Sequence, residues 1–248
     1  METIPILNLL VALLPAAVVV FISHRWVKNG AETLYGFARM FLQLSLIGYF
    51  LIYIFEAETP WPVAGVLLVM ILVASWISLR SVSVPRHVLY PLALVSVTLG
   101  GGVTLLVVSQ GVLTLDPWFA PRYLIPLAGM VFSASMTSIS LASERLEAEL
   151  ARGDSYSEAR SKALKAALIP ITNSLFAVGL VSLPGMMTGQ ILSGVSPLVA
   201  ARYQIMVMAM LYGAAGLSAA CFLTMLKSQI PLFSKTTPEE ELNNGPQR

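Results

Sequence analysis

Continuous apolar runs, most of them long enough to cross a lipid bilayer, dominate this sequence. A helix needs about 20 apolar residues to span the hydrocarbon core of a membrane. Backbone polar groups cannot stay unpaired in lipid, so each run must form a helix or join a closed barrel, and a barrel requires an alternating pattern that these runs lack. The sequence therefore predicts an all-α, polytopic membrane protein with about seven transmembrane helices. The predicted spans are residues 4–22, 37–55, 61–79, 88–108, 123–141, 168–183 and 203–226.

The composition excludes several other classes of protein. Of the 248 residues, 56% are hydrophobic and 11% are charged, whereas about 25% of the residues in a soluble domain are charged. The formal net charge of +2 comes with no separate basic patch, so we expect no nucleic-acid partner. The single cysteine, Cys221, cannot form an internal disulfide and belongs to no zinc-binding motif.

The distribution of basic residues across the loops predicts the orientation. Thirteen Lys and Arg residues fall on one side of the predicted bundle, and two, Arg122 and Arg202, fall on the other. Cytoplasmic loops of membrane proteins carry an excess of Lys and Arg. We therefore expect the N-terminus outside and the C-terminus in the cytoplasm, so the number of spans is odd. Residues 231–248 form a polar tail that we expect to be disordered, which leaves residues 1–230 as the transmembrane domain.

The connection between the fifth and sixth spans is the only long charged one. The fifth helix is expected to continue beyond the membrane, and Gly153 then suits the left-handed position that ends a helix. Asp154 and Ser155 follow as N-cap candidates. Ser155 with Glu158 has the S-x-x-E spacing of a capping box. These residues predict a second short helix that begins near Tyr156.

Two uses of this short helix are open from the residues alone. Its basic side chains, Arg160, Lys162 and Lys165, would favour the anionic surface of the membrane, or the helix could dock into a cytoplasmic partner. One face of it carries three alanines, at positions 159, 163 and 167. Pro170 follows, and we expect it to kink the chain as it enters the membrane.

Small residues interrupt or line several of the spans. Gly100, Gly101 and Gly102 break the fourth span, where they would allow either close contact between helices or a kink. The fifth span carries two rows of small residues spaced four apart, and such rows let helices approach closely, within one subunit or between two. The rows are Gly129, Ser133 and Thr137, and Ala134, Ser138 and Ala142.

Glu147-Ala148-Glu149, followed after three residues by Gly153, resembles the first half of the EAA loop of ABC importer permeases. In those proteins this loop docks into the ATPase subunit. Glu149 stands where the motif has a second alanine, and Ile169-Pro170 falls four residues late, about one helical turn. The loop is therefore related to the importer loop without matching it.

Residues 168–210 resemble a more specific family, the FetB-type (YbbM-like) permeases, which are small membrane subunits of ABC transporters associated with iron export and peroxide tolerance. The resemblance rests on the Pro170–Asn173 turn, the run LVSLPGMMTGQILSG and the Tyr203-Gln204 pair. The family includes plant relatives linked to aluminium tolerance and proposed to move a nucleotide sugar. It therefore leaves open whether the substrate is iron or an organic or sugar-linked solute.

The resemblance implies a multi-pass permease in the bacterial inner membrane, built as two copies of this chain with two copies of a separate ATPase. The chain has no G-x-x-x-x-G-K-[ST] loop, so we expect it to bind no cofactor itself, and ATP to be used by the partner subunit. Residues 144–167 are then the predicted coupling loop, through which closure of the ATPase would rock the helices. The candidate coupling residues are Glu147, Gly153, Asp154, Ser155, Tyr156, Glu158, Arg160 and Lys162.

A segment rich in Gly and Pro, residues 182–201, is too broken for a regular spanning helix. Non-helical backbone at membrane depth needs protein or a water-filled cavity around it. We therefore predict a re-entrant or interfacial hairpin, with an ordinary packed outer loop as the alternative. Gly185 and Gly189 are the hinge candidates, and Met186 and Met187 would point into the bundle. The candidate residues of the hinge or the translocation path are Gln43, Asn173, Pro184, Gly185, Met186, Met187, Gly189 and Gln190.

Ligands for a metal ion are scarce in the predicted spans. Glu56 and Glu58, at the outer edge, could attract a ferrous ion near the exit, or could be solvated loop residues. Methionine sulfur suits copper(I) better than iron(II). No H-E-x-x-H or G-x-S-x-G motif points to an intramembrane enzyme. A transport subunit is therefore the prediction, and a membrane scaffold that recruits a partner is the alternative from another class.

Overall fold

The computed structural model describes residues 5, 8, 11–27 and 30–229, so the predicted tail, 231–248, lies outside the described residues. The chain divides into two compact units, Met1–Ala57 and Glu58–Arg248, and each is described by itself. The described residues form helices and loops, with one isolated bridge between Val178 and Ser182. This confirms the predicted all-α class.

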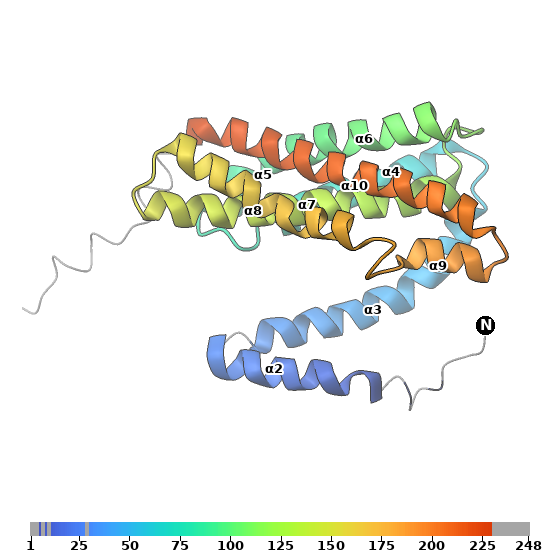
Figure 1. Ribbon diagram of the computed structural model, residues 1–248, viewed down its shortest axis with the longest axis horizontal. Coiled ribbons are helices and arrows are strands. Elements are labelled where there is room, and N and C mark those ends of the chain that lie inside the picture. Colours follow the sequence, from blue (N-terminus) through green and yellow to red (C-terminus); the bar gives the residue numbers. More distant parts are fainter. Residues whose placement is uncertain (1–4, 6–7, 9–10, 28–29, 230–248) are drawn as a thin grey trace, which may run out of the picture. The chain divides into compact units, whose positions relative to one another are not determined.

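The first unit contains two helices that pack against each other, α2 (Leu14–Val27) and α3 (Gly30–Phe55) (Figure 1). α3 is long and apolar enough to cross a membrane from Ala31 to Phe55, and it matches the predicted span 37–55. The apolar stretch of α2, Leu14–Trp26, is shorter than a span. It overlaps the predicted span 4–22, part of which lies outside the described residues.

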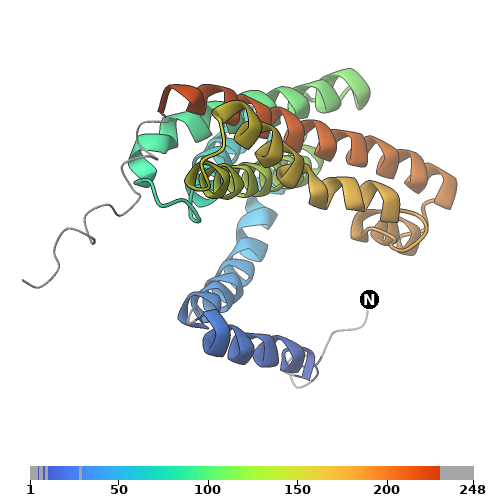
Figure 2. The same ribbon diagram turned by 60° about the vertical axis from the view of Figure 1, so that its left-hand side comes forward.

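The second unit is a bundle of long helices in which α7 packs against α4, α8 and α10 (Figures 1 and 2). Between α4 and α7 the chain forms one continuous helical segment that contains two π-helical stretches, Val97–Gly102 and Val107–Val112. The helices of this unit are α4 (Pro60–Ser78), α5 (Arg86–Ser96), α6 (Val103–Leu106), α7 (Pro121–Ala151), α8 (Tyr156–Ala177), α9 (Gly185–Leu192) and α10 (Pro197–Leu226).

Five helical segments in the described part of the chain have the length and apolar composition of membrane spans. Each overlaps one predicted span, and together they agree with a polytopic membrane protein. Large apolar side chains on their outer faces are exposed, as expected for helices whose solvent is lipid. The segments are Ala31–Phe55, Pro60–Ser78, Arg86–Val112, Pro121–Ala151 and Pro197–Gln229.

The predicted sixth span, 168–183, is wrong in its extent. α8 begins in the charged loop and ends at Ala177, and Gly179 then takes a left-handed conformation with φ of 82°. The apolar residues that follow form a turn closed by the Val178–Ser182 bridge. Because the apolar composition continues unchanged across Gly179, hydropathy alone does not reveal the break. α10 also begins earlier than predicted, at Pro197.

Gly100 and Gly101 bring the first π-helical stretch into direct contact with α10 and α7. A Cβ atom at Gly100 would lie closer than 3.0 Å to backbone and side-chain atoms of Ser218, and one at Gly101 would lie 3.0 Å from Oγ of Ser135. The Ser218 hydroxyl donates to Oγ of Ser135 at 2.9 Å. Of the two roles predicted for the three glycines, the structure confirms close contact between helices for Gly100 and Gly101, whereas Gly102 has open space around it.

Charged residues gather at one end of the second unit. α7 and α10 end there and α8 begins there, whereas α9 lies at the opposite end (Figure 1). The fifth predicted helix thus does continue past the membrane span, as far as Ala151. The basic residues at this end are Arg80, Arg86, Arg145, Arg152, Arg160, Lys162, Lys165 and Lys227.

Candidate functional site

The turn between α7 and α8 has the geometry that its sequence predicts. Gly153 has φ of 92°, which L-residues rarely adopt, and it allows the chain to reverse after α7. The Glu158 backbone N–H donates to Oγ of Ser155 at 3.4 Å, and the Ser155 backbone N–H donates to Oε2 of Glu158 at 3.2 Å. The predicted capping box is therefore confirmed, and α8 begins at Tyr156 as expected. We call residues 144–167, the predicted coupling loop, the coupling hairpin.

A buried carboxylate holds the two arms of the coupling hairpin together. The side chain of Glu149, in the last turn of α7, is only 2% exposed. Its Oε1 atom forms an ion pair with Nη2 of Arg145 at 2.6 Å and accepts a hydrogen bond from Arg152 at 2.8 Å. Its Oε2 atom accepts a hydrogen bond from Lys162 of α8 at 2.9 Å. Sequence reasoning registered Glu149 only as a departure from the EAA motif. A charged residue at a buried helix position requires partners, but the burial of Glu149 is visible only in the structure.

Lys162 contacts two carboxylates, that of Glu149 and that of Asp154 in the turn between α7 and α8. Its Nζ atom lies 2.6 Å from Oδ2 of Asp154. The hydrogen bond from Lys162 is the main cause that lowers the pKa of Asp154 below its usual 3.8. Reciprocally, the hydrogen bonds to Asp154 and then to Glu149 raise the pKa of Lys162 above its usual 10.5. Both groups are therefore charged throughout the physiological pH range.

The coupling hairpin is fastened to the rest of the bundle at several points. The Tyr156 hydroxyl donates to the backbone carbonyl of Leu223 near the end of α10. The Ser83 backbone N–H, in the α4–α5 loop, donates to Oε2 of Glu147 at 3.2 Å. The three alanines of α8 at positions 159, 163 and 167 are buried, while Arg160 and Lys165 are exposed. A force on the exposed face of α8 would therefore reach α7, α10 and the α4–α5 loop together.

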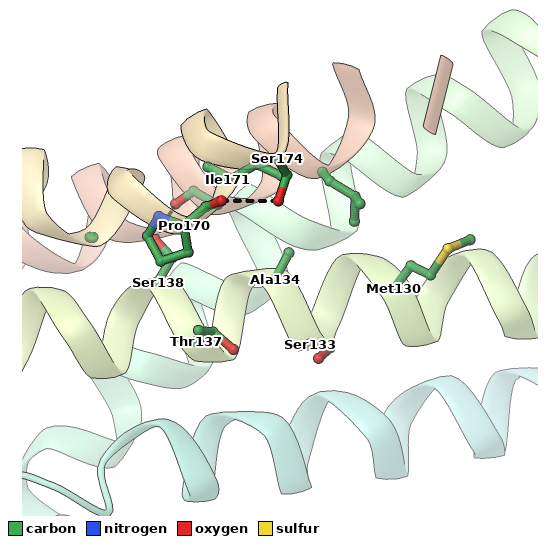
Figure 3. A pocket seen from close by; sticks show the side chains of 11 residues that line it. Met130, Ser133, Ala134, Thr137, Ser138, Pro170, Ile171 and Ser174 are labelled. Atoms are coloured by element: carbon green, nitrogen blue, oxygen red, sulfur yellow. Dashed lines mark hydrogen bonds between the residues drawn. The ribbon is translucent and has the colours of Figure 1, made fainter. Parts of the chain in front are cut away.

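An open groove of about 350 Å³ lies between α7, α8 and α10, further along α8 from the coupling hairpin. Figure 3 shows Ser133 and Thr137 on α7, with Pro170 and Ser174 on the neighbouring stretch of α8. The Ser174 hydroxyl donates to the carbonyl of Pro170 at 3.0 Å, and Ser133 and Thr137 are exposed. The row Gly129, Ser133 and Thr137 is thus only partly packed, whereas Ser138 and Ala142 of the other row are buried.

The Gly- and Pro-rich segment contains a short helix between two left-handed glycines. Gly179 and Gly194 have φ of 82° and 91°, and α9 lies between them. The predicted hinge glycines, Gly185 and Gly189, lie inside α9, and a Cβ atom at either would have open space around it. No residue of α9 is fully buried. Sequence reasoning overlooked Gly179 and Gly194 as the points where the backbone turns.

The other candidate residues of the hinge or the translocation path have mixed surroundings. Pro184 precedes α9 at its N-cap position, and Met186 and Met187 are both half-buried. The Oε1 atom of Gln190 is buried and has no hydrogen-bond partner. Asn173, on α8, is exposed. Met187 lines a second cavity, of about 420 Å³, between the end of α8, α9 and α10.

With this geometry established, comparison with known proteins places the chain. Residues 6–230 match the family described as Uncharacterised protein family (UPF0014). This chain belongs to the UPF0014 family. A UPF0014 membrane protein of Synechocystis sp., slr1647, is 32% identical over 77% of this chain and 80% of its own length. The probable iron export permease protein FetB of Escherichia coli is 33% identical over 89% of this chain and 90% of its own length.

UPF0014 relatives also occur in plants. Protein ALUMINUM SENSITIVE 3 of Arabidopsis thaliana is 36% identical over 86% of this chain and 81% of its own length. No solved structure matches the chain. The relatives confirm the resemblance to FetB-type permeases and their plant counterparts, and the likeness covers most of the chain.

The predicted metal candidates of this UPF0014 protein lie on the surface of their own units. Glu56 and Glu58 are both exposed. Over residues 5, 8, 11–27 and 30–229, the structure contains no group of three His, Cys, Asp or Glu side chains that could hold a metal ion. Gln43 lies on the exposed surface of α3 in the first unit.

Proposed function

We propose that this chain is the membrane-spanning permease subunit of an ABC transporter that exports iron. Two copies would assemble with two copies of a separate ATPase, which supplies the energy from ATP. The N-terminus lies outside and the C-terminus in the cytoplasm of a bacterial inner membrane, with about seven spans and a single transmembrane domain over residues 1–230. The excess of basic residues at one end of the second unit supports this orientation.

The observation that carries the proposal is the construction of the coupling hairpin. α8 begins outside the apolar region with a capping box, is clamped to α7 through Glu149, and continues as one helix to Ala177. A helix that docks into an ATPase must move as a rigid body if it is to transmit the motion of the ATPase to the membrane helices. The ion pairs and the buried alanine face supply that rigidity, and Arg160 and Lys165 leave a charged outer face for a partner.

The likeness to the probable iron export permease FetB supports iron as the substrate, because it extends over nearly the full length of both proteins. A ferrous ion would pass in loosely held, mostly hydrated form, since the groove in the second unit is lined by hydroxyl and apolar groups. Glu56 and Glu58 would attract the cation near the exit. The hydroxyls of Ser133 and Thr137 would line the path between two copies, because exposed polar groups are costly in lipid.

A second candidate function is export of an organic or sugar-linked solute by the same machinery. The groove supports this second candidate because the side chains of Ser133, Thr137 and Ser174 can form hydrogen bonds but carry no charge. Hydroxyl groups can donate and accept hydrogen bonds, as a sugar requires.

The proposal is tested by reconstituting the chain with its ATPase in liposomes and measuring ATP-dependent movement of ferrous iron beside a panel of sugars and sugar nucleotides. We expect iron movement that stops without ATP. Arg160→Glu should reduce both transport and substrate-stimulated ATP hydrolysis, because it reverses a charge on the outer face of α8. Unchanged ATPase association and stimulation in this variant would contradict docking through the coupling hairpin, and movement of an organic solute alone would favour the second candidate.

A further inference from the structure

Two arginines at the end of α7 meet at a single oxygen atom. Nη2 of Arg145 lies 2.6 Å from Oε1 of Glu149, and Nη1 of Arg152 lies 2.8 Å from the same atom. The side chain of Glu149 is 2% exposed, whereas those of Arg145 and Arg152 are 45% and 65% exposed. The negative charge therefore lies inside the protein, and the two guanidinium groups extend from it to the surface.

The positive charge of this cluster exceeds its negative charge. Lys162 binds the other oxygen of Glu149 and also contacts Asp154. The ion pairs here thus join three cations to two carboxylates. One positive charge is left over at the surface of the cluster, where an anionic group from outside can approach it.

The two guanidinium groups have the chemistry of a carboxylate site. Each carries five N–H donors in a planar fork, and the contact with Glu149 leaves most of these donors for other partners. Arginine commonly binds a carboxylate through two parallel hydrogen bonds. Because Glu149 already holds Arg145 and Arg152 together, less side-chain freedom is lost when they bind an anion. The pair is therefore preorganised for a single acidic group.

The position of the pair along α7 favours a protein partner over a lipid headgroup. The apolar part of α7 ends before Glu144, and a helix rises about 1.5 Å per residue, so Arg152 lies roughly 12 Å beyond that point along the axis. The headgroup region of one leaflet is only about 5–8 Å thick. A headgroup could therefore reach Arg145 but not Arg152, whereas a protein outside the membrane could reach both.

We propose that the ATPase subunit presents an aspartate or glutamate side chain that binds between Arg145 and Arg152. The inference rests on the proposed function, and it adds the acidic chemistry of the partner and a contact on α7 beside the one on α8. Glu149 positions the two arginines without touching the partner. Because Glu149 also binds Lys162, a pull on the arginine pair is transmitted to both arms of the coupling hairpin.

The first test measures the affinity of the purified ATPase for the full chain in nanodiscs of phosphatidylcholine. We expect Arg145→Gln and Arg152→Gln each to weaken binding about tenfold, the effect of losing one hydrogen bond between charged groups. The same loss is expected in nanodiscs that contain phosphatidylglycerol. The matched control is Arg122→Gln, at an exposed arginine at the opposite end of α7, which should leave the affinity unchanged.

The second test identifies the acidic partner directly. A photoreactive benzoylphenylalanine in place of the exposed Ala151 should cross-link to an ATPase peptide that contains an aspartate or glutamate. Changing that acidic residue to lysine should restore binding to Arg152→Glu, since the two charges of the contact are then exchanged. A purely structural role of Arg152 within the hairpin would not produce this rescue.

The outcomes separate this inference from the proposed function. An ATPase that does not bind the native chain overturns the proposed function and this inference with it. Native affinity in both glutamine variants overturns the inference alone. A loss of affinity that no acidic-to-lysine change in the ATPase repairs also overturns it, because the arginines then act only within the hairpin. A loss seen only with phosphatidylglycerol overturns it in favour of a lipid headgroup.

Discussion

Lys162 of α8 reaches back to Glu149 of α7, with its Nζ atom 2.9 Å from Oε2 of the buried carboxylate. The contact joins the last turn of one helix to the second turn of the next. The same carboxylate forms ion pairs with Arg145 and Arg152, so one buried negative charge contacts three cations at the charged end of the second unit. Rigidity of the coupling hairpin therefore depends more on Glu149 than on any residue of the capping box.

Glu149→Gln should loosen the coupling hairpin while keeping the shape of the side chain. The substitution removes the charge that three basic groups share, and hydrogen bonds to charged groups contribute about 2 kcal/mol in such settings. We expect faster hydrogen exchange at the amides of 150–162, and ATP hydrolysis that no longer responds to substrate. Glu144→Gln, at an exposed position five residues earlier in the same helix, should change neither. If the two variants behave alike, the Glu149 cluster does not position the hairpin.

The contact between Asp154 and Lys162 should make the turn insensitive to pH over a wide range. It lowers the pKa of Asp154, so its stabilisation is complete above the usual value of 3.8 and is lost as the pH falls through the lower folded-state pKa. It raises the pKa of Lys162, so on that side the stabilisation is complete below 10.5 and is lost as the pH rises through the higher folded-state pKa.

The measurement is an NMR titration of the Asp154 carboxyl carbon. The midpoint should lie below 3.8 in the native chain and return towards 3.8 in Lys162→Met, because the hydrogen bond that stabilises the carboxylate is gone. Lys165→Met removes a neighbouring exposed lysine and should leave the midpoint where it was. A midpoint at or above 3.8 in the native chain would show that the contact does not form in solution.

Local features of the coupling hairpin could be predicted because they depend on residues a few positions apart. Gly153 and the pair Ser155 and Glu158 specify a helix end and a helix start by themselves. Glu149 could not be predicted as the centre of the site, since its partner Lys162 is separated from it by the turn. Its burial depends on how α7 and α8 pack.

The apolar spans were predictable from composition, but their ends were not. The helix that contains residues 168–177 begins in charged sequence and ends at Ala177, two residues before the left-handed Gly179, although apolar residues continue. An average of hydropathy over this region therefore combines a helix with the turn that follows it. The cavity beside the end of α8 could not be predicted either, because it is formed by α8, α9 and α10 together.

Gly100→Ala should destabilise the bundle, and Gly102→Ala should not. A methyl group at Gly100 would overlap backbone atoms of Ser218, which cannot move without shifting α10, whereas Gly102 has open space around the same position. Overpacking of this kind costs about 1–3 kcal/mol. We expect a lower midpoint for Gly100→Ala in thermal unfolding of the detergent-solubilised chain, and an unchanged or slightly higher one for Gly102→Ala. Equal midpoints would mean that α10 does not approach this helix as closely as described.

Alanine at both Gly185 and Gly189 should stiffen α9 without disturbing its surroundings. Both sites have open space for a Cβ atom, and replacing a helical glycine by alanine stabilises a helix by up to about 1 kcal/mol. If α9 must unwind or swing during transport, the double variant should show slower hydrogen exchange in α9 together with slower transport in liposomes.

The comparison is with Gly179 and Gly194, whose positive φ makes alanine unfavourable by about 1–2 kcal/mol. Gly179→Ala and Gly194→Ala should speed hydrogen exchange in α9, because strain at its two ends loosens the segment that they define. The two pairs of substitutions thus push the stability of α9 in opposite directions. The double variant Gly185→Ala, Gly189→Ala could show slower hydrogen exchange in α9 and still transport at the native rate. That result would exclude these two glycines as hinges and would leave Gly179 and Gly194 as the points about which the segment moves.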